Sequence, residues 1–299
     1  VVAQSVGNNG IFFIQTNTAA QSSASVNLQL GAVRGSGNGG PSQNDAVAGY
    51  LGNAVIQTSG ANSLGVLVQS VGGGGGFASI ATQASGGSIN ARLGQQGGAG
   101  SAQDITITGA PKVLTQGVNA AGVVAQAITG GGGVMAVSGT SGAVFSGSVY
   151  LGGTGGGTSG NAAVSMTLSG GSIQTGGSFA PGLVAQVISG GGGLSAINAT
   201  SVNLGGTVAS KSNTLTVTNG AAITTTGAAS PGLVAQSIGG GGGLALAATG
   251  ASVRVGNKAS GADGSNITIT SNGQIYTTGV NSFGILAQSV GSGGGTVLT

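Results

Sequence analysis

The chain has 299 residues, of which 68 are glycine, 39% are hydrophobic and only 3% are charged. An average soluble domain carries roughly 25% charged residues, and disordered chains combine low hydrophobicity with high charge. The composition therefore excludes a solvated tail and indicates a folded repeat. The six lysines and arginines form no cluster, which argues against nucleic-acid binding. The absence of cysteine excludes disulfides and thiolate metal sites.

A glutamine within a short apolar segment recurs at intervals of 50 to 65 residues, about 57 on average. The six copies read VVAQSV, VLVQSV, VVAQAI, LVAQVI, LVAQSI and ILAQSV, and their glutamines are Gln4, Gln69, Gln126, Gln186, Gln236 and Gln288. Blocks of this length with so few aromatic residues cannot each build a core. We therefore predict one continuous domain over residues 1–299, cut from a longer repetitive chain.

The elements of each repeat follow in a fixed order after the glutamine segment. A glycine run comes first, then an apolar stretch such as LALAATGASVRVG (244–256), a variable loop and an alternating strand such as NITITSNG (266–273). A short segment such as GQIYTTG (273–279) closes the repeat. The strands are short, β-branched and bounded by turn residues. Regular long-range repetition favours a solenoid over a sandwich or barrel.

The predicted fold class is therefore all-β, a parallel β-helix (β-solenoid) with a glycine run once in each repeat of about 57 residues. We expect two coils per repeat, with three as the alternative. Two coils would give roughly ten levels of stacked strands and a rod of about 50 Å.

The glycine runs hold a fixed place in the repeat, although glycine loses more backbone freedom on folding than any other residue. A packed corner, where no Cβ fits and successive runs lie near one another, explains this better than a loosely ordered bulge. The structural candidates are Gly72, Gly73, Gly74, Gly75, Gly76, Gly239, Gly240, Gly241, Gly242 and Gly243, together with Gln69, Gln126, Gln186, Gln236 and Gln288.

The segment GLVAQSIGGGGG, followed by NITITSNGQIYTTG and NSFGILAQSVG, resembles the passenger region of large bacterial autotransporters, which are type V secreted surface proteins. The likeness covers essentially the whole chain and lies in the repeat pattern. It implies a right-handed parallel β-helix that is exported across two membranes and displayed at the cell surface, often for adhesion or aggregation. The N-terminal signal and C-terminal membrane barrel of that family are missing from this segment, which leaves the secretion route open.

Chemistry-bearing side chains are scarce. The chain has three acidic residues, Asp45, Asp104 and Asp263, and no histidine. Catalysis needs titratable groups in pairs or triads, so we predict no enzymatic activity, no catalytic, cofactor or metal site, and no cofactor. Each aspartate shares its repeat with an arginine, which suggests the ion pairs Arg34–Asp45, Arg92–Asp104 and Arg254–Asp263. Coincidence is the alternative, and an exposed pair would contribute only about 0–1 kcal/mol.

Two further patterns bear on function. Paired threonines in TxT segments, such as Thr216 and Thr218, could form a flat face like that of β-helical ice-binding proteins. Ordinary solvent-facing strand residues are the favoured interpretation. The nine aromatic residues are scattered, which favours core filling over a sugar-stacking surface.

We therefore expect a structural extracellular fibre or stalk of a bacterium that supports adhesion, aggregation or biofilm. The alternative is an adhesin passenger with a specific host or glycan ligand, and an ice-binding β-helix is more remote. The expected partners are further copies of the chain in filaments and a cell-surface or glycan ligand, with no nucleic acid. No stretch approaches about 18 consecutive apolar residues, so we expect no membrane insertion in this segment.

Overall fold

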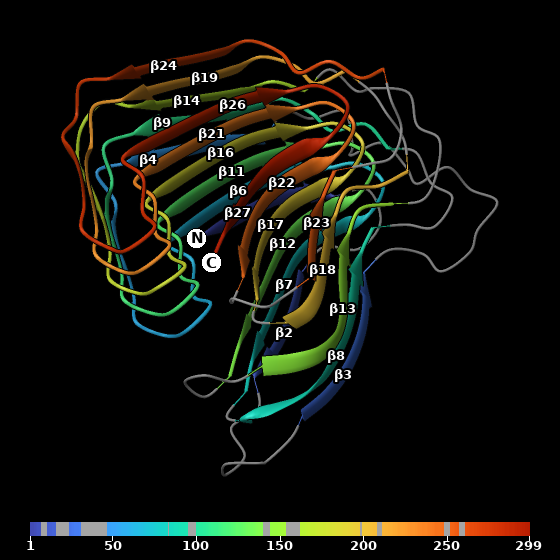
Figure 1. The fold of residues 1–299 in the computed structure, drawn as a ribbon. Coiled ribbons are helices and arrows are strands. Elements are labelled where there is room, and N and C mark those ends of the chain that lie inside the picture. Colours follow the sequence, from blue (N-terminus) through green and yellow to red (C-terminus); the bar gives the residue numbers. More distant parts are fainter. Residues whose placement is uncertain are drawn as a thin grey trace.

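The computed structural model of the chain describes residues 1–6, 11–15, 24–30, 47–82, 84–94, 100–139, 144–153, 162–197, 199–207, 211–247, 252–256 and 261–299. Over these ranges the regular structure consists of strands in five parallel sheets, A to E (Figure 1). The same ranges contain no helix with the length and hydropathy needed to cross a membrane. The predicted fold class, a parallel β-solenoid, is confirmed.

In each sheet, neighbouring strands come from successive repeats. Sheet A contains β1 (Val2–Val6), β6 (Val66–Val71), β11 (Val123–Ile128), β16 (Leu183–Ile188), β21 (Leu233–Ile238) and β26 (Ile285–Val290). Sheet B contains β2 (Ile11–Gln15), β7 (Gly75–Ala81), β12 (Gly132–Ser138), β17 (Gly192–Ile197), β22 (Gly242–Ala247) and β27 (Gly294–Leu298). Sheet C contains β3 (Ala24–Leu30), β8 (Gly86–Leu93), β13 (Val144–Leu151), β18 (Ala199–Leu204) and β23 (Ser252–Val255).

The remaining two sheets complete the coil. Sheet D contains β4 (Val47–Gly52), β9 (Ile105–Gly109), β14 (Val164–Leu168), β19 (Leu215–Asn219) and β24 (Ile267–Ser271). Sheet E contains β5 (Val55–Thr58), β10 (Lys112–Thr115), β15 (Ser172–Thr175), β20 (Ala222–Thr225) and β25 (Ile275–Thr277). The chain therefore passes through A, B, C, D and E in turn before it returns to sheet A one level further along the stack.

One repeat forms one coil. Gln69 pairs directly with Gln4 on one side and with Gln126 on the other, so residues one repeat apart are neighbours in the same sheet. The expectation of two coils per repeat is wrong, because one coil uses five strands and folds back on itself. At ~4.8 Å per level, the six strands of sheet A span about 24 Å between the first and the last, half of the expected rod.

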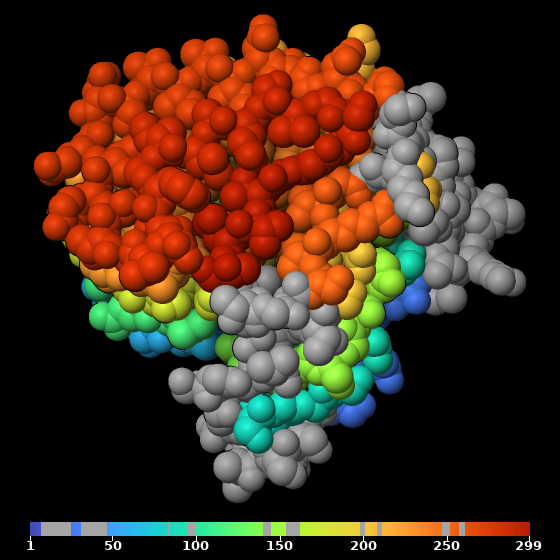
Figure 2. All heavy atoms as spheres, viewed as in Figure 1, coloured from blue at the N-terminus to red at the C-terminus, as the bar shows by residue number. Residues whose placement is uncertain are grey.

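The sheets pack as layers in the order D, A, B and C, with sheet E closing the coil between D and A (Figure 1). Sheet A packs against D through residues such as Val68 and Ile107, and against B through residues such as Leu67 and Phe77. Sheets B and C enclose a further core around Ile80 and Phe145. Figure 2 looks onto the coil formed by the C-terminal residues, with the earlier coils behind it.

The layer order explains the sequence of each strand. Every residue of β6, β11, β16 and β21 is buried, because both faces of sheet A are covered, and the sequence there is apolar at nearly every position. Strands of sheet D alternate instead, as in β14, where buried Val164, Met166 and Leu168 flank exposed Ser165 and Thr167. The outer faces of sheets C, D and E are thus the accessible surfaces of the coil.

Candidate functional site

The anchor glutamines form a ladder through the interior. The Nε2 group of each one donates to Oε1 of the glutamine one coil further toward the C-terminus, over 2.5 to 2.7 Å from Gln4 to Gln288. Gln69, Gln126 and Gln186 have no exposed surface. A buried amide must have its hydrogen bonds satisfied, and here the equivalent amides of the neighbouring coils satisfy it. The ladder is a structural element, like the stacked amides of cross-β assemblies.

The glycine run forms the sharp corner between sheets A and B, which we call the glycine corner (72–76, 130–133, 190–193, 239–243 and 293–295). Four successive residues in one coil, Gly130, Gly131, Gly132 and Gly133, have φ of +81°, +82°, +131° and +134°. Side chains other than hydrogen rarely tolerate this conformation. A Cβ on Gly132 would also overlap the carbonyl oxygen of Gly192 in the next coil. Equivalent glycines therefore pack within the chain, one coil on the next.

A second column of glycines ends sheet C and lies against the glycine corner. Gly153 N–H donates to Gly130 O over 2.6 Å, and Gly206 N–H donates to Gly190 O over the same distance. A Cβ on Gly131 would come within 2.9 Å of Gly94 Cα. At this place backbone packs directly on backbone.

The outer face of sheet C carries a column of polar side chains that differ from coil to coil. Strand pairing places in one row Gln29, Arg92, Tyr150, Asn203 and Arg254. A β-bulge in β13, between Phe145 and Ser148, precedes Tyr150. Bulges commonly re-aim side chains next to functional sites.

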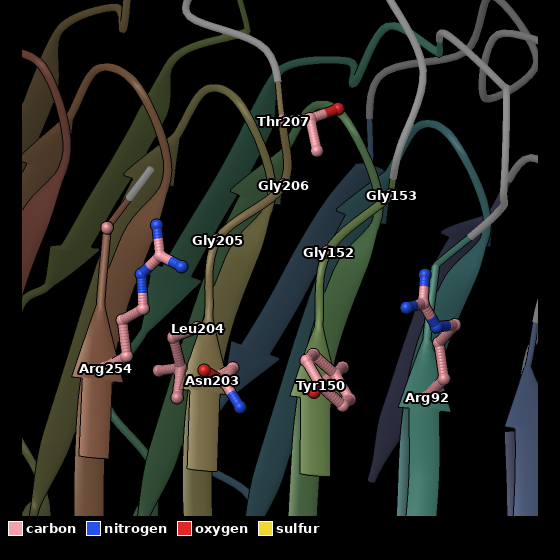
Figure 3. A pocket seen from close by; sticks show the side chains of 11 residues that line it. Arg92, Tyr150, Gly152, Gly153, Asn203, Leu204, Gly205, Gly206, Thr207 and Arg254 are labelled. Carbon is pink, nitrogen blue, oxygen red and sulfur yellow. The ribbon is translucent and has the colours of Figure 1, made fainter. Parts of the chain in front are cut away.

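Four of these side chains wall a hollow of about 300 Å³ at the end of sheet C. They come from four successive strands of sheet C and are Arg92, Tyr150, Asn203 and Arg254. Both arginine side chains extend along their strands toward the end of sheet C (Figure 3). The floor consists of the glycines that end the strands, Gly152, Gly153, Gly205, Gly206 and Gly256. A second hollow of about 330 Å³ adjoins the first and shares Arg92 and Tyr150 with it.

The site is electropositive. The Arg92 guanidinium lies 5.2 Å from the centre of the Tyr150 ring, a distance typical of a cation–π contact. Across the described ranges, neither Arg92 nor Arg254 forms a salt bridge with an acidic side chain. Arg92 is half-buried and Arg254 is exposed, so each is at least partly accessible to solvent.

The predicted ion pairs are wrong where the structure describes both partners. The Asp104 carboxylate accepts a hydrogen bond from Ala163 N–H at 2.8 Å and forms no salt bridge with Arg92. Asp263 pairs with Lys211 at 3.1 Å instead of with Arg254. The prediction relied on the short separation along the sequence. Arg92 and Arg254 lie on strands of sheet C, whereas Asp104 and Asp263 lie just before the following strands of sheet D. The third pair, Arg34–Asp45, falls outside the described residues.

The TxT threonines of sheet D align in two columns. Strand pairing stacks Thr106, Ser165, Thr216 and Thr268 in one column and Thr108, Thr167, Thr218 and Thr270 in the other. Tyr50 takes the place of the threonine in β4 and is 83% exposed. The two columns of sheet D thus carry mostly threonine and no charged side chain, unlike the column of sheet C.

Sequence reasoning identified the two arginines of the sheet C column but missed Tyr150 and Asn203. Nothing in their local sequence marks them, since the four residues come together only through the strand register. Within the described part of the chain, no three His, Cys, Asp or Glu residues gather as a metal site would require. The chain matches no known family model, no curated protein and no solved structure.

Proposed function

We propose that this chain is a structural segment of a bacterial surface fibre or stalk, extracellular and without enzymatic activity. The observation that carries the proposal is the unbroken register of the strands in sheets A and B. The glutamine ladder runs from β1 to β26 in sheet A, and the paired glycines run from β7 to β27 in sheet B, so each of these coils offers the next the same template.

Such a template suits a spacer. In a solenoid each repeat contacts only its neighbours, so length grows with the number of repeats and the cross-section stays constant. The near absence of charged residues leaves little for catalysis, and the described aspartates Asp104 and Asp263 already bind within the fold. The likeness of the repeat pattern to autotransporter passengers supports display at the cell surface, where adhesion, aggregation and biofilm formation take place.

Immunogold electron microscopy of source cells, with antibodies raised against this chain, tests the proposal. We expect label on filaments or rods outside the envelope, and loss of the label after brief protease treatment of intact cells. Label confined to the cytoplasm would overturn the proposal. Antibodies absorbed beforehand with the purified chain provide the control.

The threonine columns of sheet D favour a second candidate function, binding to ice. Strand pairing places Thr216 between Ser165 and Thr268, and Thr218 between Thr167 and Thr270, which gives the regular array of hydroxyl groups that such a surface needs. Thermal hysteresis of the purified chain tests this candidate. A freezing point equal to the melting point would eliminate it, and a Thr216→Tyr variant is the control for a positive result.

A further inference from the structure

We propose that the outer face of sheet C binds an acidic polysaccharide, with anionic groups of the sugar chain held by Arg92 and Arg254. This inference goes beyond the stalk function and does not depend on it, because the site lies on the side of the coils and leaves their stacking surfaces untouched.

Charge indicates the class of ligand. The two guanidinium groups flank Tyr150 and Asn203 and have no acidic partner among the described side chains. A guanidinium offers a planar fork of donors that matches a carboxylate or sulfate group. Arg92 and Arg254 lie three strands apart, about 14 Å, so a single small anion cannot bridge them. The ligand must carry anionic groups at intervals.

The shape of the surface indicates an extended chain. The two adjoining hollows follow one another across the strands from β3 to β23, along the direction in which the coils stack. The strand spacing of ~4.8 Å is close to the length of one sugar residue in an extended polysaccharide. Each level of the sheet can therefore face one sugar of the chain.

The polar and aromatic groups suit sugar hydroxyls and ring faces. Tyr150 is 40% exposed and presents its hydroxyl beside the apolar ring. Asn203 donates to Ser201 Oγ over 3.3 Å through Nδ2, which leaves its carbonyl oxygen as an acceptor. The glycine floor has no side chains, so a sugar can approach the backbone closely.

Nucleic acid fits the site less well. Single-stranded nucleic acid binds along rows of cations with several aromatic rings on which bases stack. The sheet C column offers two cations and one ring. The anionic group of the polysaccharide is either the carboxylate of a uronic acid or a sulfate ester. The experiment distinguishes between these two groups.

The experiment measures binding of the purified chain to short oligosaccharides by calorimetry at low ionic strength. The probes are oligogalacturonate, a heparin oligosaccharide and, as the neutral control, a maltooligosaccharide. We expect one or both acidic probes to bind, with an affinity that falls as salt is added, and the neutral probe not to bind. The stronger acidic probe identifies carboxylate or sulfate as the preferred group.

Variants locate the site. We expect Arg254→Ala and Arg92→Ala each to weaken binding about tenfold, and the double variant to abolish it. Lys112→Ala is the matched control, because it removes one exposed positive charge from sheet E and leaves sheet C intact. Its affinity should equal that of the wild type, and a cooperative thermal unfolding transition well above the assay temperature confirms that all variants fold.

Several results would overturn the proposal. Failure of both acidic probes to bind would do so, as would equal weakening by Lys112→Ala and Arg254→Ala, which indicates attraction to net charge alone. Equally tight binding of a neutral oligosaccharide or of an oligonucleotide, with the same dependence on the arginines, would also contradict it. None of these results bears on where the chain is located relative to the cell. The immunogold experiment therefore tests the stalk function independently.

Discussion

Sheets A and C are both parallel, and each contains one strand from every complete coil. They differ in whether a polar position carries the same side chain in successive coils. At the anchor position of sheet A the same side chain recurs at each level, and Gln69, Gln126 and Gln186 all bind their own equivalents. In the outer column of sheet C, Tyr150 follows Arg92, and the two side chains differ in size and charge.

The difference follows from burial. A buried anchor glutamine needs an amide partner at the levels above and below, so the same side chain recurs from coil to coil. A position on the outer face of sheet C has solvent on one side, so different side chains can occupy it as long as they are compatible with a β-strand. A polar side chain that is identical in every coil therefore indicates a structural ladder, and polar side chains that vary along an exposed column indicate where binding can arise.

The glycine corner gives the largest expected effect. Gly132→Ala places a Cβ against the Gly192 carbonyl at a φ of +131°, so we expect a loss of more than about 4 kcal/mol in the free energy of unfolding. Chemical denaturation measures it. Gly284→Ala is the control, because a Cβ there meets no atom within 4 Å. Equal stability of the two variants would contradict the packing of the corner.

The glutamine ladder gives the next largest effect. Gln186→Leu leaves Gln126 Nε2 and Gln236 Oε1 without their ladder partners, so we expect a loss of about 3 kcal/mol. Gln4→Leu removes the end of the ladder, where only one partner is affected, and should cost about half as much. A denaturation midpoint for Gln186→Leu at or above that of the wild type would show that the ladder contributes no stability.

Sheet C should respond weakly to the same test. Arg92→Ala removes the contact with the Tyr150 ring, and we expect a loss of about 0.5–1 kcal/mol. Arg92→Lys keeps a cation near the ring and should recover part of it. A loss as large as that of Gln186→Leu would mean that this face is structural, and it would remove the contrast between the two sheets.

We expect the smallest effect on stability from the exposed ion pair between Lys211 and Asp263. The side chains of Lys211 and Asp263 are 72% and 68% exposed, so solvent screens their attraction. We expect Lys211→Ala to change the free energy of unfolding by at most about 1 kcal/mol, and the change to vanish in high salt. A double-mutant cycle with Asp263→Ala measures the pair, and a salt-independent coupling would contradict this view.

The sequence predicts the elements that repeat. The alternating segment from Asn266 contains β24, and each anchor glutamine lies in a strand of sheet A. The number of coils per repeat was not predictable, because alternation identifies strands without showing how many of them close a coil. The sheet C site was hidden for the same reason, since Tyr150 and Asn203 become neighbours only once the length of a coil is known.

Some backbone positions were also beyond sequence reasoning. The turn from sheet E to sheet A has a left-handed residue in each coil, with φ of +59° at Asn119 and +49° at Ala229. Asparagine favours this conformation, and Asn119 Nδ2 additionally donates to Val137 O over 2.9 Å. Alanine does not favour it, so Ala229 adopts it because the coils on either side impose the turn.

The glutamine ladder gives the solenoid a direction. Every amide donates toward the C-terminal coils, so the amide dipoles align and reinforce one another. One end of the ladder presents an acceptor and the other a donor. The two directions along the stack are therefore chemically different, because a coil on the C-terminal side of a glutamine accepts its hydrogen bond and a coil on the N-terminal side donates to it.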